Sequence, residues 1–329
     1  MEIKIGIIGT NFISDDFCNA AVKVPGAVLR AVYSRKEETG AAFAERHSIP
    51  EVFTDYKKFL SSDIDAVYVA SPNFIHCSQT IMALEHKKHV LCEKVMAVNE
   101  AEVRSMIDCA RRNQVVLLEA MRPDFDPAFD IVEQNLNRIG QLRRATFEFC
   151  QYSSRYDKFR EGIVMNAFDP TLGNAAVMDI GVYCIHSLVR LFGMPQEIQA
   201  FSTKLSNDFD GSGIVLMKYE TMIAEAVYSK ISVSVNPSVI QGEDGSILID
   251  YISKPEKICL QLREGARDTL EGAGREILPF IPADNNMIYE IQEFIKLINE
   301  NNIDHKYLQY SLDTIRVIDE IRRQTCIDI

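Results

Sequence analysis

The sequence lacks the features that would place a protein in a membrane, on a nucleic acid or around a structural metal. No apolar run approaches the ~20 residues that span a bilayer. The formal net charge is −12 and no basic stretch is concentrated enough to neutralise phosphates, which argues against a nucleic-acid partner. The eight cysteines show no Cys-x-x-Cys or Cys/His ligand spacing, so no metal site is expected.

The cysteines also indicate a compartment. They are scattered and lie mostly within apolar segments, a pattern typical of buried, reduced thiols in a cytoplasmic protein. Residues 1–5 lead directly into a strand, without the positive and apolar regions of a secretory signal. We therefore expect a cytoplasmic protein whose partner is a small molecule rather than a membrane.

The length of 329 residues predicts two domains, because one hydrophobic core rarely extends over so long a chain. Short apolar runs alternate with helical periodicity up to about residue 119 and not beyond. We place a first domain at 1–121 and a second at 122–329.

The first domain is predicted to be a doubly wound, Rossmann-type α/β fold. Continuous Val/Ile/Leu strands separated by helices favour a parallel sheet that is covered on both faces. The expected strands are 3–8, 28–33, 66–69, 89–92 and 115–118, and the expected helices are 15–24, 36–46, 78–85 and 101–112.

The second domain is predicted to be an α+β domain with a large, mostly antiparallel sheet, because several strands follow one another without helices. One face of such a sheet can pair with a second subunit, so we expect a homodimer or homotetramer. The expected strands are 145–152, 197–205, 212–219, 223–229, 239–243, 246–249 and 257–262. The expected helices are 126–137, 177–192, 286–299 and 308–325, and 153–173 is an irregular segment of the kind that often contacts substrate.

The turn after the first strand is a candidate phosphate loop. Gly9 is placed for a tight turn, and the amides of the next helix could receive a pyrophosphate. Asn11 replaces the second glycine of G-x-G-x-x-G/A, but asparagine tolerates positive φ, so the turn is expected to survive. An ordinary strand-to-helix turn is the alternative. The candidate cofactor residues here are Gly9, Thr10, Asn11, Phe12 and Ile13.

Two further strand ends point to the cofactor. Ser34 and Arg35 follow the second strand, where an NAD-binding fold usually carries an acidic residue, so NADP is preferred and NAD is the alternative. Arg35 could instead be an ordinary solvated residue. Turn chemistry after the third strand adds Ser71, Pro72, Asn73 and His76 as cofactor-binding candidates, although His76 by itself is better explained by capping or packing.

Glu93 and Lys94 end the fourth strand, and Asn99 follows as the expected N-cap of a helix with Glu102 three residues on. Ligands of open parallel sheets bind at the carboxyl ends of strands, so Lys94 could face a ligand. A surface ion pair with Glu93 is the alternative.

The helix that begins near Met178 carries Asp179, Tyr183 and His186 at spacings of four and three, which would place them on one face. Together with a crevice lysine they could form an acid/base group. The alternative is an N-terminal Asp favoured by the helix dipole and two aromatic residues at the edge of the core.

These motifs in this order resemble the glucose-fructose oxidoreductase / inositol dehydrogenase / rhizopine catabolism (Gfo/Idh/MocA) family, and the helix motif is similar to its dihydrodiol and NADP-xylose dehydrogenase branch. The motifs are the glycine turn, Ser71-Pro72-Asn73-x-x-His76, Cys92-Glu93-Lys94, Glu119-Ala120-Met121 and Met178-Asp179-Ile180-Gly181-Val182-Tyr183. The resemblance implies that Lys94 and Tyr183 are the catalytic pair, that Asp179 orients substrate hydroxyls and that His186 lines the same pocket.

The sequence departs from the family at three places. Val95 replaces the usual proline after Lys94, Gly173-Asn174-Ala175-Ala176 replaces a triple glycine, and Arg122 replaces a tryptophan. Arg122 is a candidate substrate contact that would favour an acidic substrate, or else a surface ion-pair partner.

The expected function is hydride transfer between NAD(P) and a sugar, polyol or vicinal diol. A tyrosine, with an ordinary pKa near ~10, becomes a better base beside an ammonium, which favours the phenolate. Two readings compete with this one: a cofactor-binding sensor of the same fold without catalysis, and a scaffold that binds no cofactor.

Overall fold

The structure is a computed structural model that describes residues 1–263 and 275–327, and it divides into two compact units. Unit 1 comprises Met1–Arg122 and Ala283–Ile315, and unit 2 comprises Pro123–Pro282 and Arg316–Ile329. The sequence placed 122–329 in one domain, whereas the structure groups Ala283–Ile315 with unit 1. Helix periodicity alone gives no signal for which unit a terminal helix packs against.

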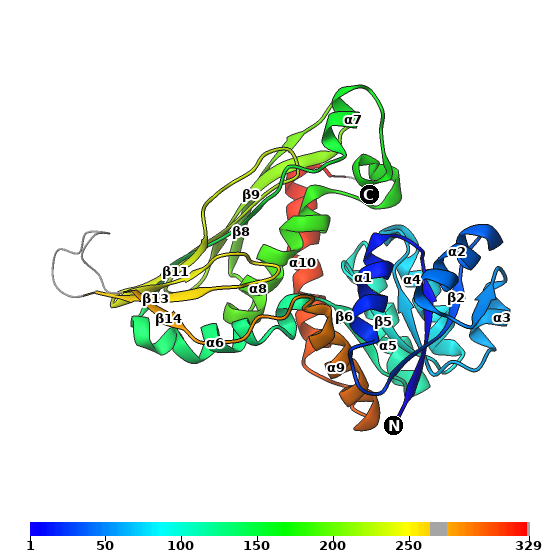
Figure 1. Cartoon of the computed structure of the whole chain (residues 1–329). Helices are drawn as coiled ribbons and strands as arrows, with labels where there is room; N and C mark the ends of the chain where they lie inside the picture. Colours follow the sequence, from blue (N-terminus) through cyan, green and yellow to red (C-terminus); the bar gives the residue numbers. More distant parts are fainter. Residues whose placement is uncertain (264–274, 328–329) are drawn as a thin grey trace. The chain divides into compact units, whose positions relative to one another are not determined.

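Unit 1 contains a six-stranded parallel sheet in the order β3-β2-β1-β4-β5-β6 (Figure 1). The strands are β1 (Ile3–Ile8), β2 (Ala27–Tyr33), β3 (Glu51–Phe53), β4 (Ala66–Val69), β5 (His89–Glu93) and β6 (Leu117–Ala120). The predicted Rossmann-type fold is therefore confirmed. The sequence did not predict β3, because three residues are too few to show a period.

The helices of unit 1 are α1 (Phe12–Ala21), α2 (Glu37–His47), α3 (Tyr56–Leu60), α4 (Asn73–Glu85), α5 (Glu100–Asn113) and α9 (Met287–Asn299). Helix α4 packs against α5, and α1 packs against α9. Between sheet and helix, the rings of Phe17 and Tyr68 stack with centroids 3.7 Å apart. Both rings are buried, and the Tyr68 hydroxyl is held at the carboxyl end of the neighbouring strand β5.

Unit 2 contains an eight-stranded sheet in the order β14-β13-β12-β11-β7-β10-β9-β8, antiparallel except for the parallel pair β7–β10. This confirms the predicted mostly antiparallel sheet, although β14 was not predicted. The strands are β7 (Leu142–Cys150), β8 (Glu197–Lys204), β9 (Asp210–Lys218), β10 (Ile223–Ser229), β11 (Ser238–Gly242), β12 (Gly245–Ile249), β13 (Ile258–Leu262) and β14 (Arg275–Leu278).

A π-helical turn, Val177–Gly181, leads into α8 (Val182–Phe192), which packs on β7 and β10. Gly181 allows this approach, because a Cβ there would lie 2.8 Å from the buried Tyr228 ring. The other helices of unit 2 are α6 (Pro127–Asn135) and α7 (Tyr156–Arg160), the latter within a segment predicted to be irregular. Helix α10 (Tyr307–Thr325) begins in unit 1 and ends in unit 2.

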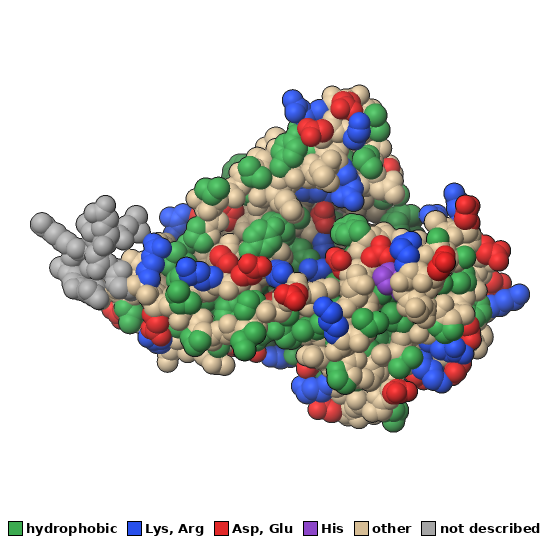
Figure 2. Space-filling model, viewed as in Figure 1, with side chains coloured by type: hydrophobic (Ala, Val, Ile, Leu, Met, Phe, Trp, Pro, Cys, Tyr) green, Lys and Arg blue, Asp and Glu red, His purple; other side chains and the backbone are tan. Residues whose placement is uncertain are grey.

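Charged side chains of both signs are interspersed over the face seen in Figure 2. That face shows no broad basic area of the kind that nucleic-acid binding requires. Among the described residues, no helix combines the length and apolar character needed to cross a membrane.

Candidate functional site

The turn after β1 is built around Gly9 and Asn11. Gly9 has φ +102°, and a Cβ at this position would lie 2.5 Å from the carbonyl oxygen of Ala70, so no larger residue fits. Asn11 has φ −92° and caps α1, its side chain accepting from the amides of Ile13 and Ser14 at 3.1 and 3.2 Å. Tolerance of positive φ is therefore not the reason that asparagine suits this turn: Asn11 caps the helix, and its side-chain amide donates to the Ala70 carbonyl oxygen at 3.1 Å.

This turn has the shape that a pyrophosphate requires. The chain passes close to β4 at Gly9 and then opens a helix whose N-terminal end carries positive dipole charge. Thr10 and Ile13 are partly exposed, and the Phe12 side chain is exposed beside them. The residues present therefore fit a dinucleotide phosphate.

The two residues that follow β2, Ser34 and Arg35, differ in burial. Ser34 is buried, its amide donates to the Phe53 carbonyl at 3.0 Å, and its hydroxyl accepts from the Lys36 amide at 3.4 Å. Arg35 is exposed at the adjoining position. A fixed serine beside a solvent-facing guanidinium can present donors to a 2′-phosphate.

The turn Ser71-Pro72-Asn73 follows β4, with Pro72 as the N-cap of α4 and Ser71 and Asn73 partly exposed. His76 is buried, and its ring nitrogens lie 2.7 Å from the Ser71 carbonyl oxygen and 2.9 Å from that of Val95. Burial lowers the pKa of His76. The imidazole thus ties this turn to the backbone that follows Lys94.

Lys94 directly follows β5 and is half-buried. Its peptide bond to Val95 is cis. The segment after it is held by Glu119, which accepts from the Met96 amide at 2.7 Å. Asn99 caps α5 as predicted, accepting from the Glu102 amide at 2.9 Å. The backbone that carries the lysine is therefore anchored on both sides.

Glu93 lies among buried polar groups beneath Lys94. Tyr68 donates to Glu93 Oε1 at 2.5 Å, and the Lys94 amide donates to Oε2 at 3.3 Å. Burial raises the pKa of Glu93, while the Tyr68 bond and the charges of Lys94 and Arg122 offset part of this rise. Arg122 thus acts on a carboxyl group within unit 1. Its predicted contact with substrate stays a prediction.

Glu290 on α9 is a second buried carboxyl group close to the first. The side chain is fully buried, and neither oxygen has a hydrogen-bond partner among the residues that the structure describes. Burial and then the charge of Glu93 raise its pKa well above the usual range, against the opposing effect of Arg122. This setting favours the protonated form of the carboxyl group in the folded protein.

In unit 2, Asp179 lies on the π-helical turn and pairs with a residue that the sequence analysis missed. The Asp179 carboxylate lies 2.8 Å from Lys230 Nζ. Asp210 holds the start of the same turn, accepting from the Val177 amide at 2.8 Å. Burial raises the pKa of Asp210 to about 6. Lys230 directly follows an apolar strand, β10, as Lys94 follows β5, and this shared position is the signal that could have found it.

Tyr183 and His186 lie further along the same helical segment. The Tyr183 ring is 9% exposed and packs near Phe149, with centroids 5.6 Å apart. His186 is fully buried, and its Nε2 lies 2.8 Å from Asp124 Oδ1. The structure thus places His186 against an interior carboxylate, and its role in lining a substrate pocket stays a prediction.

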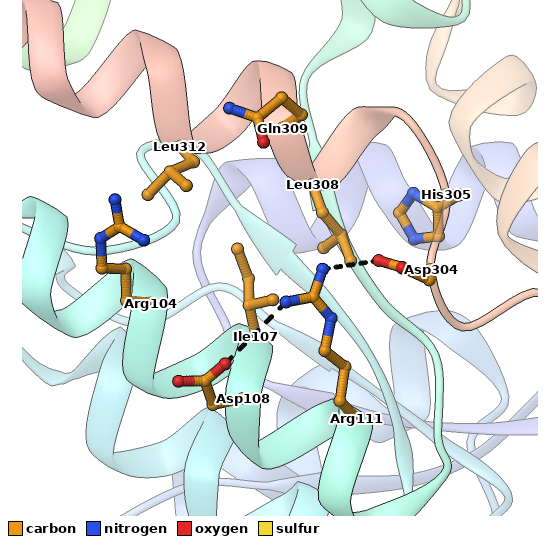
Figure 3. A pocket seen from close by; sticks show the side chains of 9 residues that line it. All are labelled: Arg104, Ile107, Asp108, Arg111, Asp304, His305, Leu308, Gln309 and Leu312. Atoms are coloured by element: carbon orange, nitrogen blue, oxygen red, sulfur yellow. Dashed lines mark hydrogen bonds and ion pairs between the residues drawn. The ribbon is translucent and has the colours of Figure 1, made fainter.

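A pocket of about 340 Å³ lies between α5 and the start of α10 in unit 1 (Figure 3). Arg111 points between two carboxylates, Asp304 at 2.6 Å and Asp108 at 3.9 Å. None of the predicted site residues lines it. Its lining is Arg104, Ile107, Asp108, Arg111, Asp304, His305, Leu308, Gln309 and Leu312.

Two family models match the chain. The model described as "Oxidoreductase family, NAD-binding Rossmann fold" covers residues 3–121, and the model described as "GFO/IDH/MocA C-terminal domain" covers residues 134–248.

Curated relatives match over most of the chain. It is 43% identical over 325 residues to scyllo-inositol 2-dehydrogenase (NADP(+)) IolU of Bacillus subtilis (strain 168), covering 98% of this chain and 97% of the relative. It is 31% identical to trans-1,2-dihydrobenzene-1,2-diol dehydrogenase of Danio rerio, covering 76% of this chain and 75% of the relative.

Solved structures share the fold at low identity. The 3-ketoreductase KijD10 from Actinomadura kijaniata, in complex with NADP and TDP-benzene, has a TM-score of 0.87 and 21% identity. Levoglucosan dehydrogenase in complex with NADH and levoglucosan has a TM-score of 0.87 and 19% identity. Each comparison covers 99% of this chain and 98% of the other.

Proposed function

Because the chain belongs to the Gfo/Idh/MocA oxidoreductase family, we propose that it transfers hydride between a nicotinamide cofactor and a CH–OH group of a sugar, polyol or vicinal diol. The resemblance inferred from its motifs is confirmed by these matches. The observation that carries the proposal is the Glu93-Lys94 pair, held at the carboxyl end of β5 in a parallel sheet, where such sheets bind ligands.

NADP is the proposed cofactor, with NAD as the alternative. Support comes from Ser34 and Arg35 at the end of β2, where no carboxylate stands. The glycine turn Gly9–Ile13 and the turn Ser71–Asn73 would lie along the dinucleotide, with unit 1 as the cofactor domain and unit 2 as the substrate and oligomer domain. NADPH should bind more tightly than NADH, and Arg35→Ala should remove the difference without weakening NADH. Equal affinities in the wild type would contradict the role of Arg35.

We assign the chemistry to Lys94, Tyr183 and Asp179. When bound, the cofactor accepts or supplies the hydride on its nicotinamide ring. Tyr183 would take the hydroxyl proton in oxidation and return it to the carbonyl in reduction, with the Lys94 ammonium favouring its phenolate. Asp179 would accept hydrogen bonds from substrate hydroxyls.

A panel of aldoses, polyols including scyllo-inositol, and vicinal diols tests this function through NADP(H)-dependent absorbance. Lys94→Ala should keep cofactor binding and lose turnover, while Lys57→Ala, an exposed lysine of unit 1, should keep both. Turnover retained in Lys94→Ala would contradict the proposed mechanism. Tight NADPH binding with no turnover on any compound would favour the sensor, and absence of binding would favour the scaffold.

We also propose that the protein is a cytoplasmic homodimer or homotetramer assembled through the sheet of unit 2. Helix α8 packs against β7 and β10 from one face of this sheet. The opposite face carries two apolar rows aligned by strand pairing, Phe201-Ile214-Val227 and Val239-Leu248-Cys259-Ile277. All eight cysteines are free, as a reducing compartment would keep them.

Light scattering after size exclusion tests this assembly. Phe201 is 66% exposed, and Val22 on unit 1, 69% exposed, provides a matched control. Phe201→Asp should reduce the mass to that of a monomer, and Val22→Asp should not. A monomeric wild type would contradict the proposal.

A further inference from the structure

Lys230 is a buried lysine that no motif or predicted role explains. It follows β10 and is 4% exposed. An ammonium in the interior is costly unless it is paired and hydrogen-bonded, so its contacts indicate what it serves.

The contacts of Lys230 converge from three segments of unit 2. Its Nζ lies 2.8 Å from Asp179 Oδ2 and donates to the Ala167 carbonyl at 2.8 Å. It also lies over the rings of Phe168 and Phe209, 5.0 and 5.3 Å from their centroids. The charge is thus enclosed by the Asp179 carboxylate, one carbonyl and two aromatic faces, and it is close enough to Asp210 to lower the pKa of that carboxyl group against the larger effect of burial.

The two members of the ion pair differ in exposure. The Asp179 side chain is 42% exposed, whereas that of Lys230 is 5% exposed. A pair that served only the interior would bury both groups. Here the ammonium is fixed in the interior, and the Asp179 carboxylate that pairs with it through Oδ2 stays partly exposed to solvent.

The same ammonium reaches the 153–173 segment. Ala167 and Phe168 belong to the 3-10 turn Asn166–Phe168 of that segment, and the Phe168 ring packs against Tyr156 and Phe159, 5.6 and 5.7 Å away. Lys230 therefore joins this segment to the turn that carries Asp179.

We propose that Lys230 is a positioning residue that holds Asp179, together with the 153–173 segment, in the orientation that receives the hydroxyl groups of an uncharged polyol. This inference rests on the proposed function, because it gives Asp179 a substrate. A partly exposed carboxylate that is fixed in place can accept hydrogen bonds from adjacent hydroxyls, whereas it would repel a carboxylate or phosphate on the substrate.

The test compares Lys230→Met with Lys218→Met, an exposed lysine on neighbouring β9. The assay measures the oxidation of scyllo-inositol by NADP. If scyllo-inositol is not turned over, the compound of the panel that reacts fastest replaces it. Lys230→Met should raise KM about tenfold to 100-fold while NADPH affinity is unchanged, because misplacement of an orienting group weakens substrate binding. Lys218→Met should behave as the wild type. A merely structural role would lower the amount of active enzyme and leave KM unchanged.

A double-mutant cycle tests the route through Asp179. Asp179→Asn alone should raise KM, and adding Lys230→Met should raise it little further, since both changes affect one carboxylate. Additive effects would overturn the proposal.

Lys230→Arg keeps the charge and serves as the test in case Lys230→Met does not fold. A KM raised at least about threefold in Lys230→Arg supports the proposal, and an unchanged KM overturns it. A wild type without turnover on the whole panel would overturn the proposed function. An active wild type whose Lys230 variants keep its KM would overturn only the role of Lys230.

Discussion

Replacing Glu290 by glutamine should stabilise the protein, and the effect should grow as the pH rises. The Glu290 carboxyl group is fully buried on α9, and within the described part of the chain neither oxygen has a hydrogen-bond partner. The groups that act on it are the Glu93 carboxyl, which raises its pKa, and the Arg122 guanidinium, which lowers it less than burial raises it. Glutamine has nearly the same shape and no proton to lose.

The sign follows from proton binding. In the unfolded chain a glutamate ionises near pH 4.3, whereas in the folded protein the raised pKa keeps Glu290 protonated to higher pH. Between these two values the folded state binds more protons, so wild-type stability falls as the pH rises through the window. Each pH unit within this window lowers the free energy of unfolding of the wild type by up to about 1.4 kcal/mol. For a structure of the size of unit 1, this corresponds to roughly 3–6 °C in Tm.

Thermal unfolding of Glu290→Gln and wild type at pH 5, 6, 7 and 8 measures this difference. The difference in Tm between Glu290→Gln and the wild type should increase by several degrees, in favour of the variant, from pH 5 to pH 7. Glu293→Gln, on the same helix and paired with Lys296 at the surface, controls for loss of a carboxylate. A Tm difference between Glu290→Gln and wild type that is the same at every pH would refute the argument, because the buried carboxyl group would then not be the source.

Three further changes test other parts of the structure. Gly9→Ala should weaken NADPH binding and lower Tm, because its Cβ would lie 2.5 Å from the Ala70 carbonyl oxygen; unchanged fluorescence titration would contradict this. His186→Leu removes the partner of buried Asp124 and should lower the free energy of unfolding by about 3 kcal/mol in urea, and a loss below about 1 kcal/mol would be inconsistent with the pair. Cys326 is the exposed thiol and should react first with a thiol reagent in the native protein, so Cys326→Ser should abolish the fast phase.

The local sequence predicted the framework of unit 1 because each element carries its own signal. Continuous apolar runs marked β1, β2, β4 and β5, and Asn99 marked the start of α5. The position of Lys94 after β5 follows from the same signals. These features depend on neighbours within a few residues, which a sequence displays directly.

The sequence by itself thus determined the fold class, the family and the strand end that carries Lys94. Only the tertiary structure decided what surrounds the predicted residues: Glu290 beside Glu93, Asp124 against His186 and Lys230 on Asp179. Each of these pairs joins residues that are far apart in the chain, and burial strengthens the electrostatic interaction within the pair. Periodicity and spacing report which side of a helix or strand is apolar, but they do not report which distant charge shares the interior with it.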